Sequence, residues 1–272
     1  MRPVPPKPEN KTALAIFAHP DDIEFRAAGT LLLLKEAGWD IHYCNLSTGD
    51  LGSMTMNRNT TTITRRLEAR DAAELLGATW HPSVAKDLQI FYEDRIIRNV
   101  AALVRVVQPD VVLTHALADY MEDHMNTARI AVTATFARGV PKYATFPRQI
   151  ATNQPVTLYH ATPHGLCDPM RNKIVPEAYV DTTSVHATKR EALACHRSQK
   201  EWLDATQGMD SFLVAMDKES AELGRMSGKF KYAEGWSRHS HLGFGAELDD
   251  PLKDVLGKRY LLNDKGQMAN VR

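Results

Sequence analysis

The stretch "TALAIFAHPDD" at residues 12–22 decides the fold of this chain. Residues 12–18 form a nearly continuous apolar run without polar alternation, which is typical of a parallel strand buried on both faces. The run ends directly in "HPDD" at residues 19–22, which crowds an imidazole and two carboxylates into one turn. Such a strand end predicts a functional site at the carboxyl edge of a parallel sheet.

Strand-like and helix-like segments alternate along the chain, which predicts βαβ units and a mostly parallel α/β sheet with helices on both faces. Helices are predicted at 24–38, 63–77, 94–108, 121–138 and 184–204, and further strands at 40–47, 110–115, 156–161 and 177–181. The segment 226–248 predicts an irregular C-terminal portion with short elements. We expect an extended arm at 1–11 and a single domain at 12–272.

Composition and charge exclude several classes of protein. Lys and Arg number 33 and Asp and Glu number 33, so the formal net charge is zero and no basic excess favours nucleic acid or an anionic membrane. Three cysteines without CxxC spacing predict neither a disulfide framework nor a cysteine zinc site. No apolar run approaches the ~20 residues of a membrane span. We therefore expect a cytoplasmic protein.

Three polar segments follow predicted strands. Residues 19–22 follow the first strand, the loop 48–62 follows the second, and residues 114–124 follow the strand at 110–115. Because ligands of such sheets bind beyond the carboxyl ends of the strands, we expect these segments to meet at one edge. Asp50 in the second segment is expected either to contact substrate or to cap a turn.

The two adjacent aspartates have two interpretations. Asp21 and Glu24 have the spacing of a capping box, so Asp21 could simply start the following helix. In the second interpretation, His19 and Asp22 bind zinc from a tight turn, and Asp21 takes a proton from the water that zinc acidifies. One carboxylate as ligand and one as base explains why two adjacent aspartates are useful.

A third metal ligand is expected in "LTHALADYMEDHMNTA" at residues 113–128. His124 would lie in the first turn of the helix after the preceding strand, and Asp123 could orient a histidine by a hydrogen bond. The alternative is that Asp119 and Glu122 form another capping box and that His124 is an ordinary surface residue.

The ordered set of motifs resembles the PIG-L/LmbE-like N-acetylglucosaminyl deacetylases. "AHPDDIEFRAAGTLLLL" resembles the family signature, and "ITRRLEARDAAELLG" resembles its R-x-x-E-A helix. "PDVVLTHALADYMEDH" stands where the family has H-P-D-H after a strand. "VDTTSVHATKREALACHRSQ" and "KYAEGW" resemble later family segments, so the likeness spans roughly residues 12–240.

The resemblance implies a Rossmann-like fold and zinc-dependent removal of an N-acyl group, often N-acetyl, from an amino sugar. It implies His19, Asp22 and His124 as the zinc ligands and Asp21 as the general base. Because nitrogen and oxygen donors accept several divalent metals, Fe²⁺ is a second candidate for the ion.

The resemblance also implies a substrate-binding arginine in the R-x-x-E-A helix. Arg65 has the family spacing to Glu68 and Ala69, and Arg66 is the next choice. A solvated basic helix face explains the same residues without any substrate. Arg26 stands where the family commonly has a small residue, and it either narrows the pocket, binds an anionic group or is simply exposed.

One departure from the family pattern affects the chemistry. Met121 occupies the place of the first histidine of H-P-D-H, which commonly stabilises the oxyanion or protonates the leaving amine. A thioether does neither, because its sulfur is only a weak acceptor. We expect that the metal alone polarises the carbonyl, or that His115 or Tyr120 takes over. The alternative for His115 is a core histidine hydrogen-bonded to the backbone.

The sequence therefore predicts a metal-dependent N-deacetylase or amidase whose substrate is an N-acyl amino sugar or glycoconjugate. Two rival hypotheses stay open: an amidase acting on a thiol conjugate or an acylated secondary metabolite, and a non-catalytic binding protein on the same fold. His239 and His241 could hold a second metal, although a polar loop at the pocket edge is the simpler interpretation. The sequence leaves homo-oligomer formation open.

Overall fold

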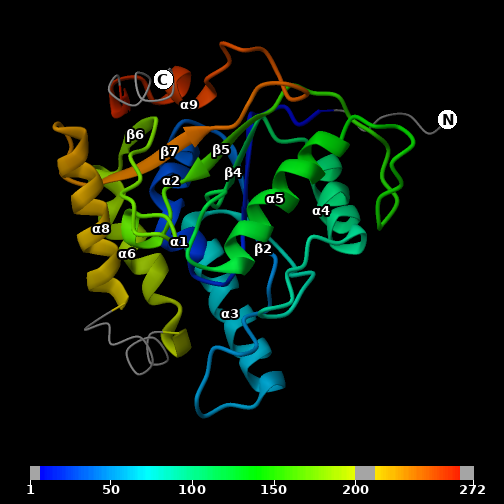
Figure 1. Ribbon diagram of the computed structural model, residues 1–272, viewed down its shortest axis with the longest axis horizontal. Helices are drawn as coiled ribbons and strands as arrows, with labels where there is room; N and C mark the ends of the chain where they lie inside the picture. Colours follow the sequence, from blue (N-terminus) through cyan, green and yellow to red (C-terminus); the bar gives the residue numbers. More distant parts are fainter. Residues whose placement is uncertain (1–6, 200–211, 264–272) are drawn as a thin grey trace.

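The computed structural model describes residues 7–199 and 212–263, which are built around one eight-stranded sheet (Figure 1). The strands in chain order are β1 (Thr12–Phe17), β2 (Asp40–Asn45), β3 (Thr79–His81), β4 (Val111–Thr114), β5 (Thr157–Ala161), β6 (Ala178–Asp181), β7 (Ala233–Arg238) and β8 (Tyr260–Leu262). Their order across the sheet is β3-β2-β1-β4-β5-β7-β6-β8. The first five strands pair in parallel, and β7, β6 and β8 continue the sheet antiparallel.

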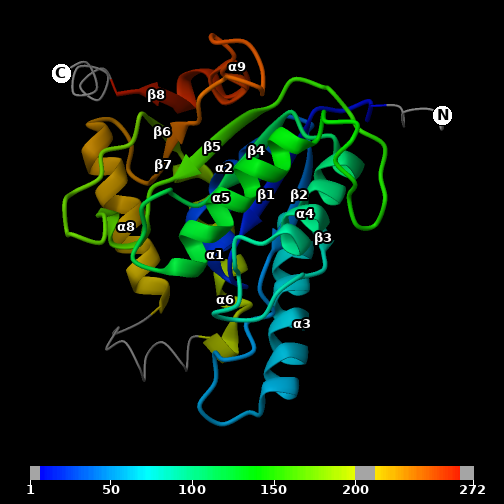
Figure 2. The same ribbon diagram turned by 45° about the vertical axis from the view of Figure 1, so that its right-hand side comes forward.

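Helices cover both faces of the sheet (Figures 1 and 2). They are α1 (Asp22–Arg26), α2 (Ala28–Glu36), α3 (Arg58–Leu76), α4 (Asp94–Val107), α5 (Glu122–Ala137), α6 (His186–Ala194), α8 (Phe212–Ser227) and α9 (Pro251–Leu256). Ala13, Ala15 and Phe17 of β1 share a core with α2, α3 and α6, whereas Leu14 and Ile16 share another with α4 and α5. A strand buried on both faces is what the unbroken apolar run predicts, so the expected fold class is confirmed.

Local signals set most helix boundaries close to those expected. Asn57 caps α3 by accepting the N–H of Thr60, so this helix begins earlier than expected, and it ends at Gly77 in the left-handed region. The helix expected at 24–38 is divided into α1 and α2 at Ala27. In the helix expected at 184–204, α6 ends at Ala194, and residues 200–204 lie outside the described residues.

The C-terminal portion contributes more regular structure than expected, because β7 inserts between β5 and β6. Its sequence "AEGWSR" lacks the apolar run that would predict a buried strand. Glu234 is nevertheless buried in this strand, because polar partners surround its carboxylate. The Glu234 carboxylate accepts the N–H groups of Gly29 and Thr30 at 2.8 Å each, in the first turn of α2. It also accepts from the Lys189 ammonium at 2.7 Å. A buried carboxylate at a helix N-terminus thus joins α2, α6 and β7.

Loss of the Lys189 charge should destabilise this junction strongly. The side chains of Lys189 and Glu234 are only 1% and 2% exposed, so Lys189→Met leaves a buried carboxylate without its cation. We expect the free energy of unfolding in urea to fall by about 3–5 kcal/mol. The double variant Lys189→Met with Glu234→Gln should recover part of the loss. A single variant within about 0.5 kcal/mol of the wild type would contradict the pairing.

Two lysines attach the N-terminal segment to the sheet. Lys7 and Lys11 both donate to the Asp110 carboxylate, at 2.6 and 2.9 Å, and so tie the segment before β1 to the start of β4. Residues 1–6 of the expected arm lie outside the described residues.

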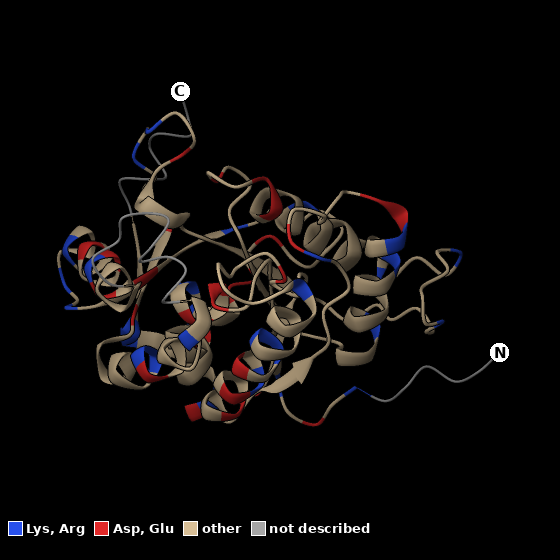
Figure 3. Ribbon diagram, turned by 90° about the horizontal axis from the view of Figure 1, so that it is seen from below, with Lys and Arg blue, Asp and Glu red and all other residues tan. Residues whose placement is uncertain are grey.

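Basic and acidic residues are mixed along the helices (Figure 3). Within the described chain, no helix combines the length and apolar character that a membrane crossing requires.

Candidate functional site

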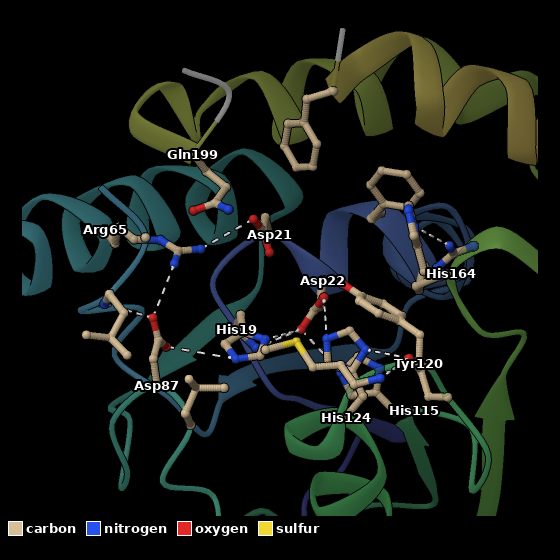
Figure 4. A pocket seen from close by; sticks show the side chains of 18 residues that line it. His19, Asp21, Asp22, Arg65, Asp87, His115, Tyr120, His124, His164 and Gln199 are labelled. Atoms are coloured by element: carbon tan, nitrogen blue, oxygen red, sulfur yellow. Dashed lines mark hydrogen bonds and ion pairs between the residues drawn. The ribbon is translucent and has the colours of Figure 1, made fainter. Parts of the chain in front are cut away.

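A cavity of about 280 Å³ lies beyond the carboxyl ends of β1 and β4. The strand order reverses here, because β2 and β3 lie on one side of β1 while β4 and β5 lie on the other. The turn after β1, the loops after β2 and β3, and the segment after β4 all line the cavity (Figure 4). The three polar segments singled out in the sequence therefore do meet at one edge of the sheet.

Two histidines and one aspartate converge on the cavity floor. One donor atom each of His19, Asp22 and His124 lies within 4.8 Å of the others. The Asp22 carboxylate has one oxygen 3.4 Å from Nδ1 of His19 and the other 3.5 Å from Nε2 of His124. Two nitrogens and one oxygen beside an accessible cavity match the donor set of a catalytic zinc site with an open position.

Buried carboxylates orient both histidines. The Nε2 atom of His19 lies 3.2 Å from Asp123, and Nδ1 of His124 lies 3.0 Å from Asp119. Metal-binding histidines almost always use their second ring nitrogen in this way, so both rings are arranged to present Nδ1 of His19 and Nε2 of His124 to a cation. The sequence indicated the orienting role of Asp123. It missed that of Asp119, whose carboxylate was an expected capping-box candidate.

Neither expected capping box forms. Asp21 is the N-cap residue of α1, but its side chain makes no capping hydrogen bond, and Glu24 is fully buried against Tyr43. The N-cap residue of α5 is Met121, also without a side-chain capping bond. Of the residues that the capping hypothesis would use, Asp21, Glu24 and Asp119 are buried beside Arg65, Tyr43 and His124 respectively. Glu122 is exposed and accepts a hydrogen bond from Asn126. The three buried carboxylates therefore do not cap these helices.

Charge compensation couples the floor residues. Burial alone would lower the pKa of His19, but Asp123 and Asp22 outweigh it and raise the pKa to about 10. Burial would likewise raise the pKa of Asp22, yet the neighbouring His124 and His115 hold that pKa well below its usual value. His19 and Asp22 thus stabilise each other's charge.

Asp21 lies beside this cluster in an uncommon conformation. Its φ of 119° is rare for a residue other than glycine, and such backbone strain concentrates at functional sites. Arg65 holds the turn, because its Nη2 donates to the carbonyl oxygen of Pro20 at 2.6 Å and to Asp21 at 3.3 Å. Burial raises the pKa of Asp21 to about 7, against the lowering effect of Arg65. A carboxyl group with such a pKa exchanges a proton readily near neutral pH.

Arg65 is placed differently from a freely accessible substrate ligand. It lines the cavity, but its side chain is only 2% exposed. Its Nη1 donates to the carbonyl oxygen of Gly49, which lies in the loop after β2. The guanidinium therefore ties this loop to the turn after β1, and the geometry favours a positioning role. Arg66 is exposed on the surface of α3.

Asp50 is buried in the loop after β2 and is not among the described residues that line the cavity, although it contacts one of them, Asp87. Its carboxylate accepts hydrogen bonds from Nε of Arg58 at 2.6 Å, from the N–H of Asp87 at 3.0 Å and from Thr48 at 3.2 Å. These bonds outweigh burial and lower the pKa of Asp50. The turn-capping alternative fits this geometry better than substrate contact.

His115 and Tyr120 both line the cavity, but they differ in access. The buried His115 stacks on His124 with ring centroids 4.1 Å apart, and its Nε2 accepts the N–H of Ala18 at 3.0 Å. Burial lowers the pKa of His115 to about 4, so the ring is neutral. Tyr120 is 54% exposed and lies edge-on to His124. Tyr120 is therefore the more accessible of the two residues.

The sequence missed Asp87, a cavity residue in the loop after β3. Its carboxylate accepts the hydroxyl of Ser47 and the N–H of Leu51. It also lies 3.9 Å from Nε2 of His19 and from Nη1 of Arg65. The rule that sites form at strand ends points to Asp87 only once β3 is recognised, and that strand has just three residues.

The described residues that line the cavity do not include His160, His196 or His239. His239 pairs with His160 at 3.0 Å, and neither His239 nor His241 belongs to a potential metal-binding group within the described residues. His196 is buried 3.2 Å from Glu24. Gln199, three residues further on, does line the cavity, and its oxygen has no hydrogen-bond partner among the described residues.

Known proteins resemble this chain over most of its length. The sequence pattern of the family described as "PIG-L: GlcNAc-PI de-N-acetylase" matches residues 14–135. A 4-oxalmesaconate hydratase of Pseudomonas putida is 30% identical over 198 residues, which cover 70% of this chain and 74% of the hydratase. A Bacillus cereus protein named "Probable N-acetyl-alpha-D-glucosaminyl L-malate deacetylase 2" is 26% identical over 199 residues, covering 69% of this chain and 83% of its own.

A solved structure shares the fold. The 4-carboxy-2-hydroxymuconate hydratase of Pseudomonas putida superposes with a TM-score of 0.70 and 26% identity, covering 88% of this chain and 99% of the hydratase. The names of these relatives include both deacetylases and hydratases, so they agree on ancestry and fold but not on substrate. The motifs, the fold and the relatives together show that this chain is an enzyme of the PIG-L/LmbE-like deacetylase family.

Proposed function

We propose that this protein is a metal-dependent deacylase that removes an N-acyl group, in the first instance N-acetyl, from an amino sugar or sugar conjugate. One observation carries the proposal: donor atoms of His19, Asp22 and His124 lie within 4.8 Å of one another in a cavity that Asp21 also lines. The family pattern named for a GlcNAc-PI de-N-acetylase and the deacetylase relative support the same chemistry.

The metal and the base have separate tasks in this proposal. A divalent ion, which we expect to be zinc with Fe²⁺ as the alternative, would supply a Lewis acid that polarises the amide carbonyl and acidifies water. His19, Asp22 and His124 are the residues that would hold it. The Asp21 carboxylate accepts the proton of the attacking water and returns a proton to the departing amine. Arg65 keeps Asp21 in place through its hydrogen bonds to that turn.

Tyr120 is proposed to supply the hydrogen bond that Met121 cannot. Figure 4 shows the Tyr120 ring between Asp22 and His164, inside the cavity. Tyr120→Phe should therefore lower kcat by about 10²–10³-fold with little change in KM, because the hydroxyl would act on the charge that develops in the transition state. Steady-state kinetics of Tyr120→Phe, His115→Ala and the wild type, measured side by side, test this expectation. If both variants turn over like the wild type, neither residue replaces the family histidine.

A hydratase is the second candidate, and two observations favour it. The relative with 30% identity is named a 4-oxalmesaconate hydratase. Met121 also stands in place of a group that protonates a leaving amine, and addition of water to a carbon–carbon double bond releases no amine. In this alternative, the oxygen of water adds to one carbon of the double bond while Asp21 accepts a proton from that water. A proton is then delivered to the other carbon of the double bond.

A paired assay distinguishes the two reactions. The metal-loaded protein is incubated with N-acetylglucosamine conjugates, including a thiol conjugate, and separately with unsaturated oxo-dicarboxylic acids. Our proposal predicts equimolar free amine and acetate from the first set and unchanged ultraviolet absorbance of the second. Loss of conjugated absorbance without amine release would replace the deacylase by the hydratase. Absence of both reactions in fully loaded protein would favour the non-catalytic binding protein.

A further inference from the structure

An arginine in the cavity wall has no part in the chemistry proposed above. Arg26, the last residue of α1, lines the cavity and is only 8% exposed. Its Nη2 donates to the Glu219 carboxylate of α8 and to Nδ1 of His164 at 2.9 Å. Its guanidinium also lies over the Phe25 ring, 4.7 Å from the centroid. Two segments distant in the sequence and the neighbouring Phe25 ring therefore hold this side chain in one orientation.

Hydrogen-bond donors remain available at this wall. A guanidinium has five N–H groups, and both hydrogen bonds of Arg26 to described residues use the same atom, Nη2. Because Nδ1 of His164 accepts one of them, a neutral His164 carries its proton on Nε2. Burial and the nearby Arg26 lower the pKa of His164, which keeps the ring neutral. Glu219 accepts from Arg26 and from the N–H of Gly165, so its oxygens are committed to the protein.

We propose that Arg26 and His164 form a subsite for a carboxylate group of the substrate, which makes the preferred substrate an acidic molecule. The planar N–H fork of arginine matches a carboxylate, and the Glu219 and Phe25 contacts fix the fork before binding. The His164 ring lies 5.7 Å from the Tyr120 ring, which in turn contacts His124. The Tyr120 ring therefore lies between the subsite and His124, one of the proposed metal ligands.

The reaction that the bound substrate undergoes rests on the proposed function, but the binding of its carboxylate does not. An acidic N-acyl sugar and an unsaturated dicarboxylic acid both carry the group that the subsite would recognise. Glu219 already compensates part of the Arg26 charge, so it competes with an incoming carboxylate. Removal of the Glu219 charge should therefore strengthen binding, whereas removal of the Arg26 charge should weaken it.

Titration calorimetry on the metal-free protein tests the subsite without any reaction. The probes are succinate and its neutral diamide, succinamide. We expect succinate to bind to the wild type and succinamide not to bind. Arg26→Gln should weaken succinate binding by about tenfold or more, and Glu219→Gln should tighten it. The matched control is Arg225→Gln, which breaks an exposed Arg–Glu pair on α8 with Glu222 and should leave binding unchanged.

Several results would overturn the inference. They are equal succinate binding by wild type and Arg26→Gln, equal binding of succinamide, absence of succinate binding to the wild type, and weaker binding by Glu219→Gln. If circular dichroism shows that Arg26→Gln does not fold, two other variants test the subsite. We expect Arg26→Lys to bind succinate more weakly than the wild type and Glu219→Gln to bind it more tightly. An active deacylase without this binding pattern would refute the subsite alone. An inactive protein with the full pattern would refute the proposed function alone.

Discussion

Asp21→Asn should lower kcat by about 10²–10⁴-fold, the range that a well-placed general base contributes. The amide of asparagine has nearly the shape of the carboxylate but does not accept a proton from water. The variant keeps an oxygen that can receive the Arg65 hydrogen bond, so the turn at Pro20 and Asp21 should stay in place. The loss should therefore appear in turnover and not in the fold.

The controls for this variant separate a base from a structural residue. Metal content, measured by plasma emission spectroscopy, should match that of the wild type, because Asp21 is not among the three converging donors. Asp71→Asn removes an exposed carboxylate on α3 and should leave kcat unchanged. An Asp21→Asn protein with wild-type turnover would remove Asp21 from the mechanism. Metal loss in this variant would instead make Asp21 a ligand.

His124→Ala should abolish both metal binding and turnover. The substitution leaves only His19 and Asp22 in the proposed ligand set, and the ion contributes several kcal/mol of transition-state stabilisation. We expect kcat/KM to fall by about 10³-fold or more. Removal of the metal from the wild type with a chelator should produce the same loss of activity. Added zinc should restore the activity of the chelated wild type but not that of His124→Ala.

Variants of the neighbouring carboxylates test how the ion is held. Asp22→Asn should lose the metal, whereas Asp119→Asn should retain it with about 10–100-fold weaker affinity, because Asp119 only orients His124. A second set of donors, His115, Asp119 and His124, also lies within 4.8 Å of one another. If Asp119→Asn loses the ion and Asp22→Asn keeps it, the metal belongs to this second set.

Short-range patterns predicted the edge of the sheet at which the candidate site lies. An apolar run without alternation predicts β1 as a strand buried on both faces, and residues 12–17 are fully buried in the structure. Parallel strands end at a common edge, so the turn at 19–22 and the segment at 114–124 could be expected to meet. The position of His124 in the first turn of α5 followed from the helix predicted at 121–138 after β4.

Partners distant in the sequence explain what could not be predicted. Glu234 is buried in β7 because Lys189 and the first turn of α2 neutralise it, and no local pattern shows that pairing. Spacing identified Arg65 as a family arginine. It could not show that Gly49 and Pro20 would occupy its N–H groups. Asp87 follows a strand too short to give a periodic signal.

Anomalous diffraction at the zinc edge, on crystals of the zinc-loaded protein, tests the central claim most directly. The account predicts one strong peak on the cavity floor, about 2.0–2.2 Å from a nitrogen of His19, a nitrogen of His124 and an oxygen of Asp22. A peak bound to His115 and Asp119 instead, or no peak within bonding distance of His19, would contradict it.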